Sequence, residues 1–194
     1  EHFPSDVVEL QGYLGERSLV PGVEANPGKG TQVPLFILGS SLFGAKLAAR
    51  LGLPYGFASH FAPDALEEAV ALYRAEFKPS QQLAKPSVIA GVNVIAADSD
   101  EEAEAQLRVV KRVRVKALIG KGNHWTDEEA DMVLDSPAGR SIEHMTTYTA
   151  VGTKAKVQAY IERFAAHSRA DELIVVHPSP TLKERLRSIE LLVG

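Results

Sequence analysis

Short apolar runs alternate with longer helical patterns along most of this chain. Apolar runs of strand length occur at residues 34–38, 55–59, 87–96 and 172–176. Between them, apolar residues recur three and four positions apart, which is the spacing of a helix that buries one face. Short buried strands that alternate with helices are typical of βαβ units, so the pattern predicts an α/β fold with a parallel sheet.

The turn after the first predicted strand carries the most informative chemistry. Gly39, Ser40 and Ser41 follow an apolar strand and precede a helix whose first turn contains Gly44. The first turn of a helix leaves backbone N–H groups unpaired and carries partial positive charge, so this turn can bind an anion, most often a phosphate. Gly39 would let a ligand approach the backbone, Ser40 or Ser41 could donate a hydroxyl, and Gly44 would keep the first turn uncrowded. The alternative is an ordinary N-cap, in which Ser41 caps its own helix and binds nothing.

The other segments are predicted from the same periodicities. Residues 19–32 are rich in Pro and Gly and lack a periodic pattern, which indicates a long loop. That loop is either a lid over a site or a plain crossover on the surface. Helices are predicted at about residues 3–14, 64–77, 98–119, 126–134, 151–164 and 181–192.

Composition narrows the class of protein without identifying it. The chain has 194 residues, no cysteine and a formal net charge of -4. This length supports one domain with a real core, and the absence of cysteine excludes disulfides and thiolate metal sites. There is no apolar run of about 18 residues to predict a membrane span, and the negative charge gives no reason to bind nucleic acid. We therefore expect a cytoplasmic protein with no membrane or nucleic-acid partner.

Four segments carry a resemblance to a known family. They are VPLFILGSSLFGAKLAARLGLPYGFASHFAPDALEEAVALYRAEFKPS, PSVIAGVNVIAADSDEEAE, YTAVGTKAKVQAYIERF and ADELIVVHP, in this order. Over nearly its whole length the chain resembles the C-terminal half of the bacterial-luciferase-like family of flavin-dependent monooxygenases. The resemblance implies an α/β fold that is the C-terminal half of a luciferase-like (β/α)8 TIM barrel. Residues 1–194 would then form a single domain with a variable helical insertion near 120–150.

The resemblance also implies an activity and a cofactor. Enzymes of this family use reduced FMN and molecular oxygen on small organic substrates, or the deazaflavin F420 in some branches, and FMN is the cofactor expected here. Their phosphate loop follows the fifth barrel strand, where Gly39, Ser40 and Ser41 fall, although the luciferase subunits carry an acidic residue at the position of Ser40. Two other functions stay open. One is a non-catalytic flavin-binding or structural subunit of the same fold, and the other is an unrelated α/β protein that binds phosphorylated sugars.

Polar residues near the ends of predicted strands are further candidates. His60 follows the strand at 55–59, and the resemblance places it among the cofactor-binding residues, near the flavin ring or the substrate; a histidine that only caps the next loop is the alternative. Asn93 either points toward a ligand or satisfies a neighbouring backbone group, and His177 is a weaker candidate. No two histidines have the spacing of metal ligands, so no metal site is predicted. The resemblance assigns the family's catalytic histidine to a segment outside this chain, so the catalytic residues stay unassigned.

A basic cluster lies near the end of the long helix predicted at 98–119. Cations are favourable at a helix C-terminus, and a surface for an anion or a partner is the alternative interpretation. The cluster consists of Lys111, Arg112, Arg114, Lys116 and Lys121.

The resemblance further implies a larger assembly. A TIM barrel has eight strands, whereas four are predicted here, and roughly 130–150 residues of a family member would precede this chain. A four-stranded half-barrel would leave strand edges and an apolar face uncovered. We therefore expect the chain to be a fragment that pairs with the missing N-terminal half or with a second copy of itself, and a homodimer is the expected assembly.

Overall fold

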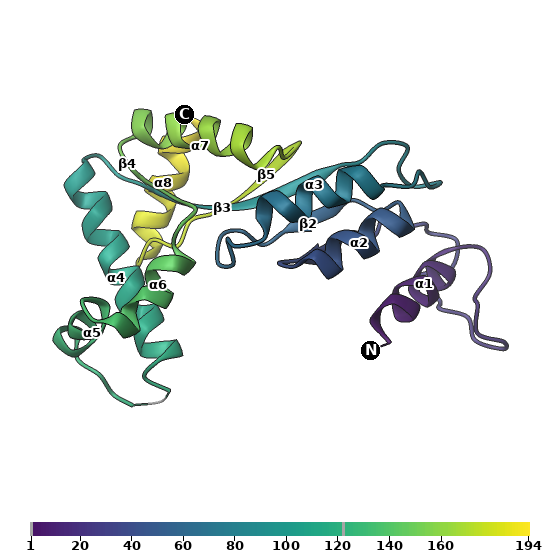
Figure 1. Cartoon of the computed structure of the whole chain (residues 1–194), viewed down its shortest axis with the longest axis horizontal. Helices are drawn as coiled ribbons and strands as arrows, with labels where there is room; N and C mark the ends of the chain where they lie inside the picture. The colour runs from purple at the N-terminus through teal and green to yellow at the C-terminus, as the bar shows by residue number, and fades with distance from the viewer. Residues whose placement is uncertain (1, 122) are drawn as a thin grey trace.

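The computed structural model describes residues 2–121 and 123–194 as a mixed α/β fold around a parallel sheet (Figure 1). The strands are β1 Ile37–Gly39, β2 Tyr55–Phe57, β3 Val88–Ala96, β4 Thr149–Gly152 and β5 Glu172–Val176. The helices are α1 Phe3–Leu14, α2 Leu42–Leu51, α3 Leu66–Glu76, α4 Asp100–Leu118, α5 Asp127–Leu134, α6 Arg140–Met145, α7 Lys154–Ser168 and α8 Leu182–Val193, with a short 3-10 turn, η1, at Pro137–Gly139. The predicted fold class, α/β with a parallel sheet, is confirmed.

The sheet is organised around β3, its longest strand. All pairings are parallel: β1 pairs with β2, and β3 pairs with β2, β4 and β5. The N–H of Tyr55 donates to Ser87 and that of Asn93 to Tyr148, whereas the N–H of Asp171 donates to Val88. Because alternate residues of a strand bond to opposite sides, β2 and β4 lie one after the other along one edge of β3, and β5 lies along the other edge. Figure 1 shows β3 running from the region of α2 and α3 to the region of α4 and α8.

Three predictions about the strands need correction. The second strand ends at Phe57 rather than at residue 59. The first strand spans Ile37–Gly39 rather than residues 34–38, because it pairs only with the three residues of β2. Residues 149–152 form β4, whereas a helix was expected to begin at 151. β4 pairs with residues 93–96 of β3, beyond the part that β2 covers. A four-residue strand of this kind exists only because a free strand edge is available to it, and the local sequence does not contain that information.

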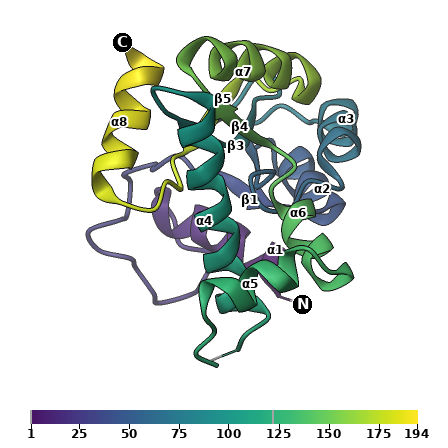
Figure 2. The ribbon, with the colours of Figure 1, turned by 90° about the vertical axis from the view of Figure 1, so that its left-hand side faces the viewer.

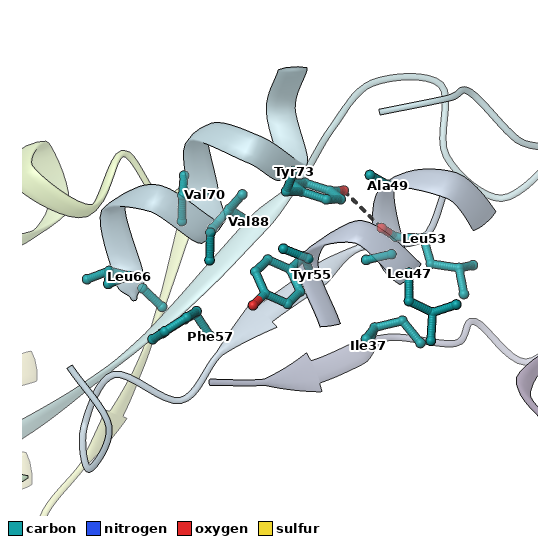
Figure 3. Packing of buried hydrophobic residues seen from close by; sticks show 14 of the residues in the cluster. Ile37, Leu47, Ala49, Leu53, Tyr55, Phe57, Leu66, Val70, Tyr73 and Val88 are labelled. Atoms are coloured by element: carbon teal, nitrogen blue, oxygen red, sulfur yellow. Dashed lines mark hydrogen bonds between the residues drawn. The ribbon is translucent and has the colours of Figure 1, made fainter. Parts of the chain in front are cut away.

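The main hydrophobic core lies between one face of the sheet and a layer of helices. Ile37, Tyr55, Phe57 and Val88 point toward α2 and α3, and Figure 3 shows their side chains interleaved with those of the two helices. The hydroxyl of Tyr73 in α3 donates to the carbonyl of Leu53 at 2.9 Å, which ties α3 to the segment between α2 and β2. This layer therefore fixes α2 and α3 against β1 and β2.

Part of the opposite face of the sheet is open to solvent, whereas its end at Ile95 is covered by α4. Leu38 of β1 is 72% exposed and Ile174 of β5 is 54% exposed, although both are apolar strand residues. Gly56 and Ile89 lie on the same face in the registers of β2 and β3. Helices thus cover one side of the sheet, and an apolar surface remains on the other.

The long loop at residues 19–32 folds back onto α1. The N–H of Gly30 donates to the carbonyl of Gly15, and that of Gln32 donates to the carbonyl of Leu14. The loop therefore returns to the end of the helix that it leaves. None of the helices within the described residues combines the length and the apolar composition that a bilayer crossing requires.

Helices α4, α5 and α6 form a second, smaller packing unit. Its core consists of Val115, Ala130, Leu134 and Ile142. Figure 2 shows α4 crossing the view with α5 and α6 at its lower end and α8 to one side. α8 is anchored to the sheet where Ser188 Oγ accepts a hydrogen bond of 2.9 Å from the N–H of Ala96, the last residue of β3. This unit and α8 thus lie around the carboxyl end of β3.

Candidate functional site

The turn between β1 and α2 is held by β2 and not by its own hydroxyl groups. Ser41, the N-cap of α2, has an extended backbone and a side chain that makes no capping hydrogen bond. Instead, the hydroxyl of Tyr55 donates to the Ser41 carbonyl at 3.1 Å, and the N–H of Ala58 donates to the Gly39 carbonyl at 2.9 Å. Ser40 and Ser41 are exposed, so both hydroxyls are available to a ligand.

The N-terminus of α2 differs from three other helix starts in the chain. The side chains of Ser99, Thr126 and Thr181 each accept a hydrogen bond from a backbone N–H in the first turn of their helices. Those three helices also carry acidic residues in the first turn, whereas α2 has none. The partial positive charge at the start of α2 is therefore neither capped nor balanced, which favours an anion there.

The two glycines of the turn leave it bare without being required by packing. A Cβ built on Gly39 would lie 3.7 Å from the Cα of Gly44, and one built on Gly44 would lie 3.4 Å from the Tyr55 ring. Both distances are ordinary van der Waals contacts. The protein itself would therefore accept small side chains at both positions, so packing does not require the two glycines.

His60 lies at the end of β2 and packs against β3. A Cβ on Gly91 would overlap His60 Nδ1, so the glycine makes room for the ring. The ring stands edge-on to Phe61, with centroids 4.8 Å apart, and its buried Nδ1 has no hydrogen-bond partner among the described residues. Burial lowers the pKa of His60 below its ordinary value of 6.5, and the positive charge of Arg114 lowers it further. A neutral imidazole is therefore favoured at this position.

Asn93 and His177 are both engaged with the protein. The Nδ2 of Asn93 donates to the carbonyl of His60, so the amide satisfies a neighbouring backbone group, while its buried Oδ1 has no partner in the described chain. His177 Nδ1 lies 2.7 Å from Ser188 Oγ, the atom that anchors α8 to β3. Burial lowers the pKa of His177, which suits a neutral ring that accepts the serine proton. His177 thus supports the packing of α8.

The structure brings two of the predicted site segments, Gly39–Ser41 and His60, to the carboxyl end of the sheet. Gly39 and the segment leading to His60 stand at the carboxyl ends of the adjacent strands β1 and β2, whose registers match at Gly39 and Phe57. Sequence reasoning missed Tyr55 and Gly91 as the residues that position this end. It assigned Arg114 only to a basic cluster, and nothing local in the sequence marks its proximity to His60.

Comparison with known proteins identifies the class. The family model described as luciferase-like monooxygenase matches residues 5–175, and the chain belongs to this family. A luciferase-like monooxygenase of Escherichia coli (strain K12) is 38% identical over 193 residues, which cover 98% of this chain and 58% of the relative. The chain thus spans less than two thirds of the length of the curated relatives that it matches.

Solved structures agree with this assignment. The crystal structure of apo-MsnO8 matches with a TM-score of 0.80 and 30% identity, over 99% of this chain and 59% of that one. Two more distant structures share the fold alone. They are a riboflavin lyase with modified FMN, at 17% identity over 88% of this chain and 44% of that one, and a coenzyme F420 dependent tetrahydromethanopterin reductase, at 11% identity over 95% and 59%, with TM-scores of 0.54 and 0.57. The predicted family and its luciferase-like fold are therefore confirmed.

Proposed function

We propose that the protein is a flavin-dependent monooxygenase that uses reduced FMN and molecular oxygen on a small organic substrate. In this proposal the chain binds the FMN phosphate at the turn formed by Gly39, Ser40 and Ser41. The observation that carries it is the uncapped N-terminus of α2, which stands beside two exposed serines at the carboxyl end of β1. Parallel-strand enzymes place their ligands at this end of the strands.

The residues present fit a phosphate and a flavin ring. The free N–H groups of the first turn of α2 and the hydroxyls of Ser40 and Ser41 would hold the phosphate. His60 and Phe61 would border the ring with a neutral imidazole and an aromatic edge. The flavin supplies the redox chemistry with oxygen when it is bound, and the protein binds and orients it and excludes water.

We further propose that this chain forms one half of a barrel. Two observations support this: the chain spans 58% of the length of the E. coli relative, and one face of its sheet exposes Leu38 and Ile174. The other half would come from a longer polypeptide or from a second copy in a homodimer. The resemblance implies FMN or, in some branches of the family, F420. We propose FMN as the cofactor here.

Comparing the affinities for FMN and riboflavin separates the contribution of the phosphate to binding from that of the ring. We expect FMN to bind at least tenfold more tightly than riboflavin, because only FMN carries the phosphate. The double variant Ser40→Ala/Ser41→Ala should weaken FMN binding by about tenfold or more, since two charge-assisted hydrogen bonds are lost, and should leave riboflavin binding unchanged. Isothermal titration calorimetry measures all four affinities.

The matched control is Thr153→Ala. Thr153 is the N-cap of α7 and, like Ser41, makes no side-chain capping hydrogen bond. This substitution should leave FMN affinity unchanged. Equal affinity for FMN and riboflavin would show that the phosphate is not bound at α2, and tighter binding of F420 than of FMN would transfer the proposal to the deazaflavin.

The alternative function is a flavin-binding subunit without catalysis. Oxygen consumption in the presence of FMN and a flavin reductase distinguishes the two functions. A monooxygenase consumes oxygen faster when its organic substrate is added and forms an oxygenated product. FMN binding without a substrate-dependent change would favour the non-catalytic subunit.

A further inference from the structure

A cavity lies between α4 and the loop that leads from β5 into α8. Its volume is about 290 Å3, near the lower end of the range for small-molecule pockets, so it suits one end of a ligand. Apolar side chains make most of its walls, and two arginines belong to the same lining. The lining residues are Val109, Val110, Val113, Arg114, Pro178, Ser179, Pro180 and Arg185.

Arg114 is unlike the other cations of α4. Arg108, Lys111, Arg112 and Lys116 are each ion-paired with an acidic residue of α5, of α6 or of the segment between them. Within residues 2–121 and 123–194, Arg114 has no acidic partner, and its Nη1 reaches only the carbonyl of Met145, at 3.3 Å. A helix whose other cations are paired thus presents one unpaired guanidinium at the cavity.

The guanidinium of Arg114 is also partly withdrawn from water. Its side chain is half-buried, and burial lowers its pKa below the ordinary value of an arginine, which still leaves it charged at neutral pH. A buried charge without a counter-ion is unfavourable, and an anion beside it would relieve that cost. The same charge lowers the pKa of His60, so Arg114 acts electrostatically on a residue of the candidate flavin site.

The α8 side of the cavity adds a second cation and an unused hydroxyl. Arg185 lies in the first turn of α8, where a cation is unfavourable to the helix dipole, and no acidic residue of the described chain pairs with it. Its neighbour Glu184 is committed to the cap, through hydrogen bonds to the N–H and the hydroxyl of Thr181. Ser179 is 1% exposed, and its Oγ has no hydrogen-bond partner among residues 2–121 and 123–194.

We propose that this cavity binds a carboxylate group on the organic substrate, with Arg114 and Arg185 as its ligands and the valines and prolines around the adjoining carbon chain. Guanidinium groups hold carboxylates through paired, charge-assisted hydrogen bonds. Unpaired cations beside apolar walls fit a molecule that is acidic at one end and apolar along its length. This inference rests on the proposed function for the existence of a substrate, and it deepens that function by naming the substrate class.

Calorimetric titration of the flavin-free protein with octanoate tests the inference. 1-Octanol has the same chain length without the charge and should bind at least tenfold more weakly. Arg114→Gln and Arg185→Gln should each weaken octanoate binding by about tenfold, because each removes charge-assisted hydrogen bonds. Arg185 is exposed, so its variant keeps the test valid if the half-buried Arg114 variant fails to fold.

The matched control is Arg108→Gln, which removes a cation from the same helix. Arg108 is paired with Asp131 and does not line the cavity, so octanoate affinity should stay unchanged. Equal binding of octanoate and octanol, or equal loss in the Arg108 variant, would overturn the inference.

Two further titrations identify the source of the anion and separate this inference from the proposed function. If the cavity held the flavin phosphate, Arg114→Gln would weaken FMN binding and octanoate would compete with FMN; this result would overturn the carboxylate assignment. If the Ser40→Ala/Ser41→Ala variant loses FMN but keeps octanoate, the two sites are distinct, as we expect. Octanoate binding by a protein that never binds FMN would contradict the flavin proposal and leave the carboxylate site standing.

Discussion

The layer formed by β1–β3 with α2 and α3 and the unit formed by α4–α6 are held together by different forces. The first has a continuous core in which large side chains such as Tyr55, Phe57 and Tyr73 are almost fully buried. The second has a small core, and ion pairs at its surface join α4 to α5 and α6. Both regions reach the same end of the sheet, where the first carries the proposed phosphate turn and the second carries Arg114.

This difference shows which part of the site is rigid. Close-packed apolar cores resist small displacements, so the Gly39–Ser41 turn is held in one geometry. Exposed ion pairs contribute little stability each and weaken in salt, so α4–α6 should open locally at lower free energy than the sheet layer. A rigid site for the proposed cofactor and a softer wall for the proposed substrate would follow from this arrangement.

The largest expected effect is that of Phe57→Ala in the sheet layer. Phe57 is 1% exposed and packs edge-on to Tyr55. Its loss should lower the free energy of unfolding by about 3–5 kcal/mol, through lost burial and a residual cavity. Chemical denaturation measures the change.

Ile142→Ala in α6 is the comparison variant. It should cost about 2 kcal/mol, and hydrogen exchange should show lost protection in α4–α6 alone. Lost protection that extends equally through β1–β3 would contradict the view that the two regions are separately stabilised.

The anchoring of α8 to the sheet is tested by Ser188→Ala. This change leaves the N–H of Ala96 buried without its acceptor and should cost about 1–3 kcal/mol. Ser141 lies exposed on α6, and Ser141→Ala should change the free energy of unfolding by less than about 0.5 kcal/mol. Equal effects of the two substitutions in thermal or chemical unfolding would show that α8 is not anchored through Ser188.

The serines at the starts of α4 and α2 allow the two regions to be compared by removing a single hydroxyl from each. Ser99→Ala removes the cap of α4 and should cost about 1 kcal/mol. Ser41→Ala removes no hydrogen bond within the chain and should stay within about 0.5 kcal/mol of the parent protein. If denaturation shows the same loss for both, Ser41 caps α2 and is not reserved for a ligand.

The smallest effect is expected from the surface ion pairs. Arg112 and Arg108 lower the pKa of Asp131 from its usual 3.8 to about 2. A lowered carboxyl pKa stabilises the fold above the usual value, and this contribution is lost as the pH falls from 3.8 toward 2. Protection of α4–α6 in hydrogen exchange should therefore decrease in that window.

Asp131→Asn should remove this dependence on pH. It should also reduce the loss of protection when salt rises from about 0.1 M to about 1 M, where screening shortens from about 10 Å to about 3 Å. The control is Asp6→Asn on α1, far along the chain from this unit, which should leave the profile of α4–α6 unchanged. A profile unaltered by Asp131→Asn would show that the ion pairs contribute nothing.

Much of the fold could be predicted because it depends on short-range patterns. The strand at 172–176 was predicted with its observed bounds, and the long strand at 87–96 begins only one residue later in the structure. β4 could not be predicted, because its four residues become a strand only where β3 offers a free edge. The start of β1 was misplaced for a related reason, since its length is set by the three residues of β2.

The candidate site also has residues that the sequence could predict and residues that it could not. Sequence reasoning proposed Gly39–Ser41 and His60 because both follow apolar runs, and residues that follow parallel strands meet at one edge of the sheet. The basic cluster was explained by the helix C-terminus, whereas Lys111, Arg112 and Lys116 in fact pair with acids of α5 and α6. No local pattern could show that Arg114 stays without such a partner.

The sequence by itself determined the α/β class, the family, most of the strands and helices, and the turn where an anion is expected. The family follows from the resemblance of the quoted segments, and the rest follows from periodicity, capping residues and glycine positions, which act over a few residues. Tertiary structure alone decided that the Ser41 hydroxyl stays free while Tyr55 holds its carbonyl, that His60 packs on Gly91, and that Arg114 faces a cavity shared with Arg185. Each of these is a contact, or an absent contact in the described chain, between residues far apart in sequence, and burial and charge pairing over such distances are set only when the elements pack.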